Sequence, residues 1–209
     1  MPRFPGRGLY VITDCERMDF DDCLLRTRLL LDTGIAVLQF RDKAPDYNLR
    51  LERALALAEL CHEHGTFFII NDDISLALET GVQALHIGRD DPAYGQARSS
   101  LGATAVIGVS CYNELERAQE FQLAGADYVA FGAFFSTGTK TGTVHAGIEL
   151  LRAARPELHI PVVAIGGITP ANGRQLVEAG ADMLAVISSV YNSEEPEDTV
   201  RQFYRIFDR

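Results

Sequence analysis

Lysine is rare in this chain, and each of its two lysines closely follows an apolar run of the kind that forms a β-strand. Lys43 ends the segment 39–43 after the run 36–38, and Lys140 ends the segment 134–140 after the run 128–131. Every other long basic side chain is an arginine. The lysine ammonium is a compact point charge that suits phosphate groups. The position of both lysines therefore predicts phosphate binding where strands end.

Carboxylates follow two further apolar runs. Asp72 and Asp73 come after residues 67–71, and Asp90 and Asp91 come after residues 84–87. Magnesium binds one or two protein carboxylates and completes its coordination with substrate phosphate and water. Aspartates at these places could instead cap the helices that follow. Beside two lysines suited to phosphate, they favour a magnesium site.

Three later loops predict a second anion site. The segment 137–140 offers hydroxyl groups, a glycine and a cation, the segment 165–170 contains paired glycines, and the segment 187–189 contains paired serines. Glycine permits close approach of the backbone to a phosphate, and helix N-termini favour anions. Two anion sites without an evident nucleophile suggest an enzyme that joins two phosphorylated substrates while pyrophosphate leaves.

These residues can converge only if the strands that carry them form a closed sheet. Short apolar runs alternate with helical patterns along the chain, which is typical of a parallel sheet covered by helices. The expected strands are 8–13, 36–41, 67–71, 84–87, 105–110, 128–133, 161–166 and 183–188. The clearest expected helices are 47–64, 113–124, 170–179 and 196–207.

A closed barrel is favoured over an open doubly wound sheet. An open sheet gathers its polar residues at a topological switch point, whereas here they follow strands two to eight. Gly34, Gly81, Gly125 and Gly180 each lie between a helical pattern and a strand, at a spacing of two β/α units that suits eight units. We predict one domain, residues 1–209, with the α/β fold of a single (β/α)8 TIM barrel.

Composition narrows the function classes. The chain has 209 residues and a net charge of −10, which argues against a nucleic-acid or anionic-membrane surface. No apolar stretch approaches the length of a membrane span. The four cysteines show no close pairing in sequence, which indicates reduced thiols and a cytoplasmic protein. The segment 61–64 has cysteine and histidine, but its place at a helix end argues against a metal site.

The motifs resemble those of the thiamine phosphate synthase family in order and spacing, and the likeness covers nearly the whole chain. They are the segments 9–14, 39–43, 70–72, 86–91, 107–110, 137–140 and 163–168. The resemblance implies a transferase that couples hydroxymethylpyrimidine pyrophosphate to hydroxyethylthiazole phosphate, giving thiamine phosphate and pyrophosphate. Arg89 and Ser136 stand where the family commonly has glutamine and proline.

The resemblance also implies a role for individual residues. The pyrimidine pyrophosphate would be held by Gln39, Arg41, Lys43, Asn71, Ser110 and Lys140, of which Arg41, Lys43, Ser110 and Lys140 would be catalytic. Asp72 and Asp91 would bind Mg²⁺ as the cofactor. The thiazole phosphate would be held by Thr137, Thr139, Gly167, Ile187 and Ser188. The implied reaction is dissociative and needs no covalent intermediate on Cys111 or another nucleophile.

Two alternatives stay open at this point. A thiazole tautomerase relative shares the barrel and the late phosphate loops, but does not need the set Asp72, Asp91 and Lys140. A non-catalytic protein that binds thiazole phosphate needs neither the carboxylates nor the lysines. Small-molecule substrates are the expected partners, without nucleic acid or membrane, and the sequence leaves a homo-oligomer open.

Overall fold

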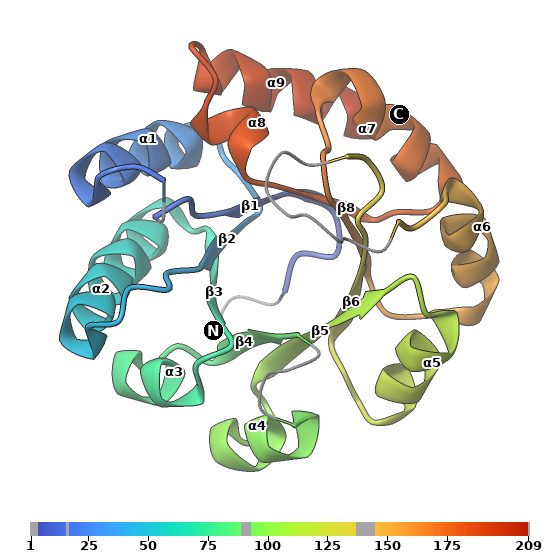
Figure 1. Ribbon diagram of the computed structural model, residues 1–209, viewed down its shortest axis with the longest axis horizontal. Helices are drawn as coiled ribbons and strands as arrows, with labels where there is room; N and C mark the ends of the chain where they lie inside the picture. The colour runs from blue at the N-terminus through green and yellow to red at the C-terminus, as the bar shows by residue number, and fades with distance from the viewer. Residues whose placement is uncertain (1–3, 16, 89–92, 137–144, 209) are drawn as a thin grey trace.

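The computed structural model describes residues 4–15, 17–88, 93–136 and 145–208. Eight parallel strands form a closed barrel in chain order, and β1 pairs with both β2 and β8 (Figure 1). The strands are β1 (Gly8–Ile12), β2 (Val37–Phe40), β3 (Phe67–Asn71), β4 (Ala84–Ile87), β5 (Val106–Tyr112), β6 (Tyr128–Phe131), β7 (Val162–Ile165) and β8 (Met183–Val186). The predicted (β/α)8 barrel is therefore confirmed.

Helices surround the barrel as an outer ring (Figure 1). They are α1 (Phe20–Asp32), α2 (Tyr47–His64), α3 (Ile74–Thr80), α4 (Tyr94–Leu101), α5 (Leu115–Leu123), α6 (Ile148–Glu157), α7 (Pro170–Ala179), α8 (Ser188–Tyr191) and α9 (Pro196–Phe207). Three of the four helices predicted most clearly have the predicted ends, and α5 is shorter at both ends. No helix among the described residues is long and apolar enough to cross a membrane.

Alternation along the strands separates two apolar clusters. Leu38, Ile70 and Val129 belong to the larger cluster between the sheet and the helices. Tyr10 and Tyr128 belong to the smaller cluster inside the barrel. Because neighbouring side chains in a strand point to opposite faces, this assignment also fixes which polar side chains face the interior.

Most strand ends differ from the prediction by one or two residues, and the differences at β5 and β8 affect the site. Strand β5 continues to Tyr112, with an irregularity in its pairing to β6 between Ser110 and Tyr112. Ser110, predicted as the last residue of this strand, therefore lies two residues before its end. Strand β8 ends at Val186, and Ser188 begins the short helix α8.

The predicted glycine turns are present but more frequent than the proposed period. Gly34, Gly81, Gly125 and Gly180 all have positive φ, as expected of residues that end a helix. Gly65 also has positive φ, and it follows α2. The turn therefore marks consecutive units, and the spacing of two units was not the real repeat.

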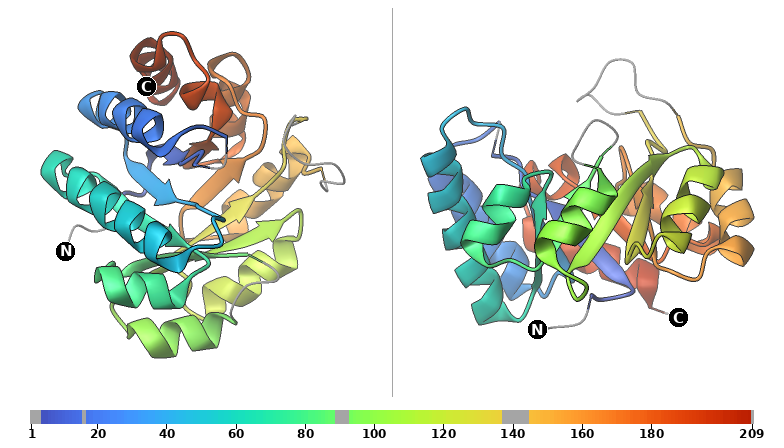
Figure 2. Two further views of the ribbon diagram at one scale, coloured as in Figure 1. Left: turned by 60° about the vertical axis from the view of Figure 1, so that its left-hand side comes forward. Right: turned by 90° about the horizontal axis from the view of Figure 1, so that it is seen from below.

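The two ends of the barrel differ. Figure 2 shows the N-terminus and C-terminus on the same side of the molecule, where the strands begin. The opposite end, which we call the mouth, is formed by the loops that follow the strands. Active sites of such barrels lie at this end. The predicted site residues all follow or end strands, so the fold gathers the described ones at the mouth.

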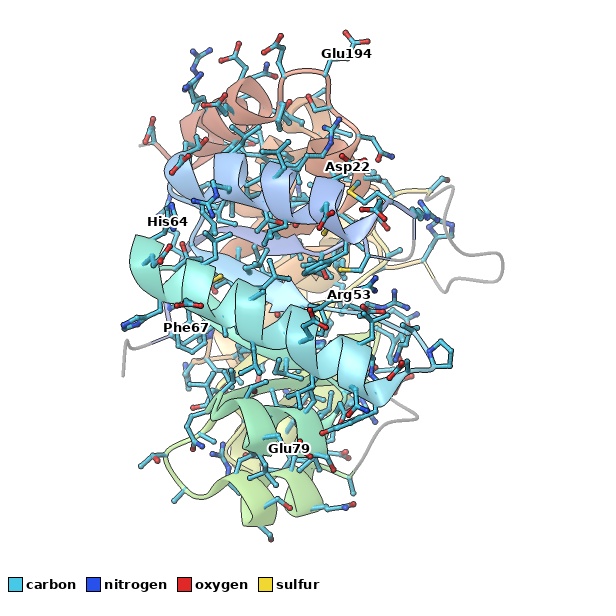
Figure 3. All side chains as sticks on the ribbon, turned by 90° about the vertical axis from the view of Figure 1, so that its left-hand side faces the viewer. Asp22, Arg53, His64, Phe67, Glu79 and Glu194 are labelled. Carbon is cyan, nitrogen blue, oxygen red and sulfur yellow. The ribbon has the colours of Figure 1, made fainter. Side chains whose placement is uncertain are left out.

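The end of α2 carries an ion pair far from the mouth. His64 Nε2 lies 3.0 Å from Asp32 Oδ1, and His64 Nδ1 lies 2.8 Å from the Leu60 carbonyl oxygen. These contacts, first the one to Leu60, raise the pKa of His64. Figure 3 shows Arg53 and His64 toward opposite ends of this helix. The histidines of segment 61–64 thus belong to a helix end, as the sequence indicated.

The raised pKa of His64 predicts a pH-dependent contribution to stability. A group whose pKa is higher in the folded state stabilises the fold below its unfolded pKa, and this contribution is lost as the pH rises through the folded value. The His64→Gln substitution should therefore lower the melting temperature more at about pH 5.5 than at about pH 8.5. His62→Gln, at an exposed histidine of the same helix, is the control. An equal loss at both pH values would contradict the ion pair.

Candidate active site

A cavity of about 510 Å³ opens at the mouth between the loops after β2 and β3. Its lining includes three predicted site residues, Lys43, Asn71 and Asp72. The loop after β2 contributes Lys43, and the end of β3 contributes Asn71 and Asp72. Adjacent parallel strands thus bring a cation, an amide and a carboxylate to one cavity, as the sequence predicted.

Lys43 and Asp72 form an ion pair. Lys43 Nζ lies 2.6 Å from Asp72 Oδ2, and the two side chains are 50% and 20% exposed. The Asp72 backbone has φ of 65°, in the left-handed region that aspartate tolerates better than most residues. Its N–H donates to the His86 carbonyl oxygen at 2.8 Å, which fixes it between β3 and β4. Exposed ion pairs contribute little to stability, so this pair can exchange partners when an anion binds.

Arg41 is positioned through its backbone by Thr13. The Thr13 Oγ1 hydroxyl donates to the Arg41 carbonyl oxygen at 3.0 Å and accepts from the Arg41 N–H at 2.9 Å. Thr13 is only 2% exposed, so its hydroxyl is shielded from competing water. The paired hydrogen bonds join the ends of β1 and β2 and set the direction in which the arginine leaves the sheet.

Asp42 anchors the loop after β2 to helix α2. Its side chain is 2% exposed and lies 2.8 Å from Arg53 Nη1. The other carboxylate oxygen accepts from the Ala44 N–H at 2.8 Å. The hydrogen bond that Arg53 donates to Asp42 raises the pKa of Arg53, whose guanidinium also lies 4.9 Å from the centre of the Phe20 ring. The loop that carries Arg41 and Lys43 is thus held at its middle residue.

Removal of this anchor should cost both stability and affinity. Asp42→Ala leaves Arg53 without its carboxylate, which should lower the free energy of unfolding by about 3 kcal/mol. Denaturation in urea measures this loss, and the double substitution Asp42→Ala/Arg53→Met should recover part of it. We also expect weaker binding of pyrophosphate, because Lys43 is no longer held in place. If Asp42→Ala alone were as stable as the wild type, the ion pair of Asp42 with Arg53 would not contribute to the stability of the fold.

Three predicted residues belong to the rows of side chains that face the barrel interior. Gln39 is two residues after the interior residue Val37, and Asn71 is two after Ile69. Gln39 is 2% exposed, whereas Asn71 and Ser110 are partly exposed. The amides and the hydroxyl therefore form a polar layer between the apolar interior and the mouth.

From Ser110 in this layer, hydrogen bonds lead down into the barrel to three further side chains. His86 Nε2 lies 2.9 Å from Ser110 Oγ, and His86 Nδ1 lies 2.9 Å from the Tyr128 hydroxyl. The Tyr128 hydroxyl lies 2.9 Å from that of Tyr10. Sequence reasoning missed all these partners of Ser110. Their alternation with apolar residues predicts an interior position but not a hydrogen bond across four strands.

The loops after β6, β7 and β8 lie together on another side of the mouth. The Phe135 N–H donates to the Gly166 carbonyl oxygen at 3.0 Å. A side chain on Gly167 would bring its Cβ to 2.7 Å from the Ser136 carbonyl oxygen, and φ at this glycine is +62°. Ser188 is exposed at the start of α8. This is the recurrent phosphate position in such barrels, next to a short extra helix after β8.

The packing of Gly167 changes one expectation. The resemblance places Gly167 at the thiazole phosphate, so Gly167→Val would be expected to block that site alone by preventing close approach of the backbone to the phosphate. It would in fact displace Phe135 and Ser136, the residues that lead into the segment of Lys140. Such a variant would disturb both predicted anion sites, so it cannot test whether they are separate.

The remaining candidates divide into two groups. Asp91, Thr137, Thr139 and Lys140 lie outside the described residues, together with Arg89. Asp73 Oδ1 accepts from the Leu76 N–H at 3.0 Å, so it caps α3 as the alternative interpretation proposed. Cys111 is fully buried, and burial raises its thiol pKa to about 12, which rules it out as a nucleophile.

All four cysteines are free, as predicted, but two of them touch. Cys15 Sγ lies 3.7 Å from Cys23 Sγ, across the loop between β1 and α1. The sequence spacing of eight residues gave no sign of this contact, which the fold creates. Among the described residues no group of three or more histidines, cysteines and carboxylates gathers in a metal-binding arrangement. Asp72 is the described carboxylate that could hold Mg²⁺, with phosphate oxygens completing the site.

Comparisons with known proteins agree with this geometry. A family model described as thiamine monophosphate synthase matches residues 9–190. A thiamine-phosphate synthase of Thioalkalivibrio sulfidiphilus is 44% identical over 202 residues, covering 97% of this chain and 96% of the relative. One from Xanthomonas campestris is 48% identical over 198 residues, covering 95% and 94%.

A solved structure shows the same likeness in three dimensions. It is a thiamine phosphate pyrophosphorylase from Pyrococcus furiosus, with a TM-score of 0.85 and 31% sequence identity. The match covers 96% of this chain and 95% of that one. Fold, length and sequence therefore agree over almost the whole molecule.

Proposed function

This chain belongs to the thiamine phosphate synthase family, and we propose that it couples hydroxymethylpyrimidine pyrophosphate to hydroxyethylthiazole phosphate. It is accordingly a transferase whose products are thiamine phosphate and pyrophosphate. The observation that carries the proposal is the corner of Lys43 and Asp72 in the cavity after β2 and β3. A cation and a carboxylate in contact there match a metal-bound pyrophosphate, which a protein for one monophosphate does not need.

The donor set of this corner fits magnesium. The Asp72 carboxylate borders the cavity and provides hard oxygen ligands, and Asp91 of the next β/α loop would provide a second carboxylate. Bound Mg²⁺ would supply positive charge to the pyrophosphate oxygens. Lys43 has a half-exposed side chain and a weak surface ion pair with Asp72, so it can turn from Asp72 and donate to the pyrophosphate itself.

We assign each of the predicted pyrimidine-site residues a task in the reaction. Gln39, Asn71 and Ser110 hold the pyrimidine at the polar layer beneath the mouth. Arg41, Lys43 and Lys140 donate hydrogen bonds to the pyrophosphate, on which negative charge grows as its bond to the methylene carbon breaks. Hydrogen-bond donors that point at this developing charge lower the activation free energy of the step more than they strengthen binding of the substrate in its ground state.

The thiazole phosphate would occupy the second corner. Gly167, Ile187 and Ser188, which follow β7 and β8, would hold it. By the resemblance, Thr137 and Thr139 would also bind this phosphate. The ring nitrogen of the thiazole then forms the new bond to the methylene carbon that pyrophosphate has left. The electrons of the broken bond leave with pyrophosphate, so no enzyme nucleophile takes part.

The proposal extends to partners and location. The expected partners are the small-molecule substrates, and the four free thiols support a cytoplasmic location. Homo-oligomer formation stays a prediction. The tautomerase interpretation is less favoured, since the named relatives reported above are synthases or a pyrophosphorylase.

The experiment that tests the function supplies the purified protein with both substrates and Mg²⁺. We expect thiamine phosphate, separated by chromatography, only when both substrates are present. The control supplies the thiazole substrate alone, in the isomeric form that a tautomerase would convert. Conversion of that isomer without thiamine phosphate formation would replace the proposal by the tautomerase alternative.

A further inference from the structure

A chain of hydrogen bonds runs through the barrel interior and ends at Ser110. Three contacts of 2.9 Å join the side chains of Tyr10, Tyr128, His86 and Ser110 in this order. Tyr10 and Tyr128 are 2% and 0% exposed, and His86 is 9% exposed. The chain therefore connects the water-shielded interior with a residue of the proposed pyrimidine site.

The barrel interior provides a fitted space for the Tyr128 side chain of this hydrogen-bond series. A side chain on Gly108 would place its Cβ only 1.9 Å from the Tyr128 ring, so glycine makes the space that the ring occupies. The ring of Phe4 stacks on the ring of Tyr128, with the two centroids 4.5 Å apart. These contacts fix Tyr128 and hence the position of its hydroxyl beside His86.

Both tyrosines keep their protons. Burial raises the pKa of Tyr10, and it raises that of Tyr128 well above the ordinary value. Each phenol therefore has one O–H to donate, and the hydrogen bonds along the chain must run in one consistent direction. In the first direction Tyr10 donates to Tyr128, Tyr128 donates to His86 Nδ1, and His86 Nε2–H donates to Ser110. In the second direction every donor and acceptor is reversed.

The buried end decides between these directions. Within the described part of the chain, the hydrogen-bond partner of the Tyr10 hydroxyl is Tyr128. In the second direction Tyr128 donates to Tyr10, and the Tyr10 proton is then buried without an acceptor, which is unfavourable. An imidazolium at His86 gives the same result, because both its nitrogens donate. The first direction satisfies each buried proton.

We propose that His86 is a positioning residue, held as the neutral Nε2–H tautomer, that makes the Ser110 hydroxyl a hydrogen-bond donor to the pyrimidine pyrophosphate substrate. Since Ser110 Oγ accepts from His86, its own proton is left to point toward the ligand. The atom that meets Ser110 must therefore be an acceptor, such as a ring nitrogen or a phosphate oxygen. This inference rests on the proposed function for its ligand, but the tautomer can be tested without it.

The first test is nuclear magnetic resonance of the protein labelled with ¹⁵N-histidine. The His86 signals are identified by their loss in His86→Gln. We expect a protonated Nε2 and an unprotonated Nδ1 in the wild type. A proton on Nδ1, alone or on both nitrogens, would overturn the proposal. This measurement does not depend on turnover. An inactive wild type would therefore refute the proposed function, but the measurement would still decide the direction of the hydrogen bonds from Tyr10 to Ser110.

The second test measures steady-state kinetics. Tyr128→Phe keeps the ring but removes the donor to His86 Nδ1 that holds the Nε2–H tautomer. It should lower kcat/KM for the pyrimidine substrate roughly tenfold, as for one lost hydrogen bond. Tyr204→Phe removes a hydroxyl that donates to the Gly34 carbonyl oxygen far from the mouth, and it should change nothing. Equal effects of the two variants on kcat/KM would contradict a role of this hydrogen-bond series in positioning Ser110.

A double-mutant cycle separates positioning from simple loss of stability. If Tyr128 acts through His86 and Ser110, the effect of Tyr128→Phe on kcat/KM should disappear in the Ser110→Ala background. Melting temperatures of all variants are compared in parallel. If the tenfold loss persists without Ser110, the tyrosine affects the site by another route and the proposal fails.

Discussion

Replacement of Asp72 by alanine should abolish most turnover and leave the fold intact. Asp72 lies at the cavity edge and pairs with Lys43 at the surface, so its loss creates no hole in the core. Without this carboxylate the proposed magnesium site loses one protein ligand, and pyrophosphate leaves without that compensating charge. We expect kcat to fall roughly a hundredfold or more. The melting temperature should fall only slightly, because alanine tolerates the left-handed backbone of this position less well than aspartate. Turnover of the wild type should likewise vanish in excess chelator and return with Mg²⁺.

The neighbouring carboxylate provides a matched control. Asp73 caps α3 and lies 3.1 Å from Arg50 Nη2, so Asp73→Ala should lower stability by about 1 kcal/mol. Turnover per folded molecule should be retained in this variant. Full activity of Asp72→Ala, or of the wild type in excess chelator, would remove magnesium from the account.

Loss of a cation that faces the leaving group should slow the chemical step more than it weakens binding. Arg41→Ala and Lys140→Ala should each lower kcat by roughly 10²–10³, because charge builds on pyrophosphate in the transition state. The Michaelis constant for the pyrimidine substrate should change much less. Steady-state kinetics at saturating thiazole phosphate measure both constants.

An arginine on the outer ring controls for a general effect of charge. Arg152 lies on α6 with 61% of its side chain exposed, and Arg152→Ala should have wild-type kinetics. An Arg41 variant with a raised Michaelis constant and an unchanged kcat would instead indicate uniform binding of ground state and transition state. The proposed role in the departure of pyrophosphate would then be wrong.

The fold was largely predictable because local and global signals agree in this chain. Each strand is a short apolar run, and glycines such as Gly34 and Gly81 mark helix ends through their positive φ. The differences that affect the site occur at the ends of β5 and β8. Ser110 lies in a strand whose pairing is irregular, and Ser188 begins a helix of four residues, too short for its periodicity to be visible in sequence.

The candidate site was predictable only in part. Residues at strand ends, such as Lys43 and Asp72, reach one cavity because adjacent parallel strands end together. The supporting contacts follow no sequence spacing. Thr13 reaches Arg41 across a strand pair, and Asp42 reaches Arg53 on the next helix, so only the three-dimensional packing of these elements reveals them.

The most direct test of the central claim measures both products of one reaction. The wild-type protein is given both substrates with Mg²⁺, and the initial rates of thiamine phosphate and pyrophosphate formation are followed together. The account predicts equal rates for the two products, and loss of both in Asp72→Ala. Formation of pyrophosphate without thiamine phosphate, or formation of neither product by the folded wild type, would contradict it.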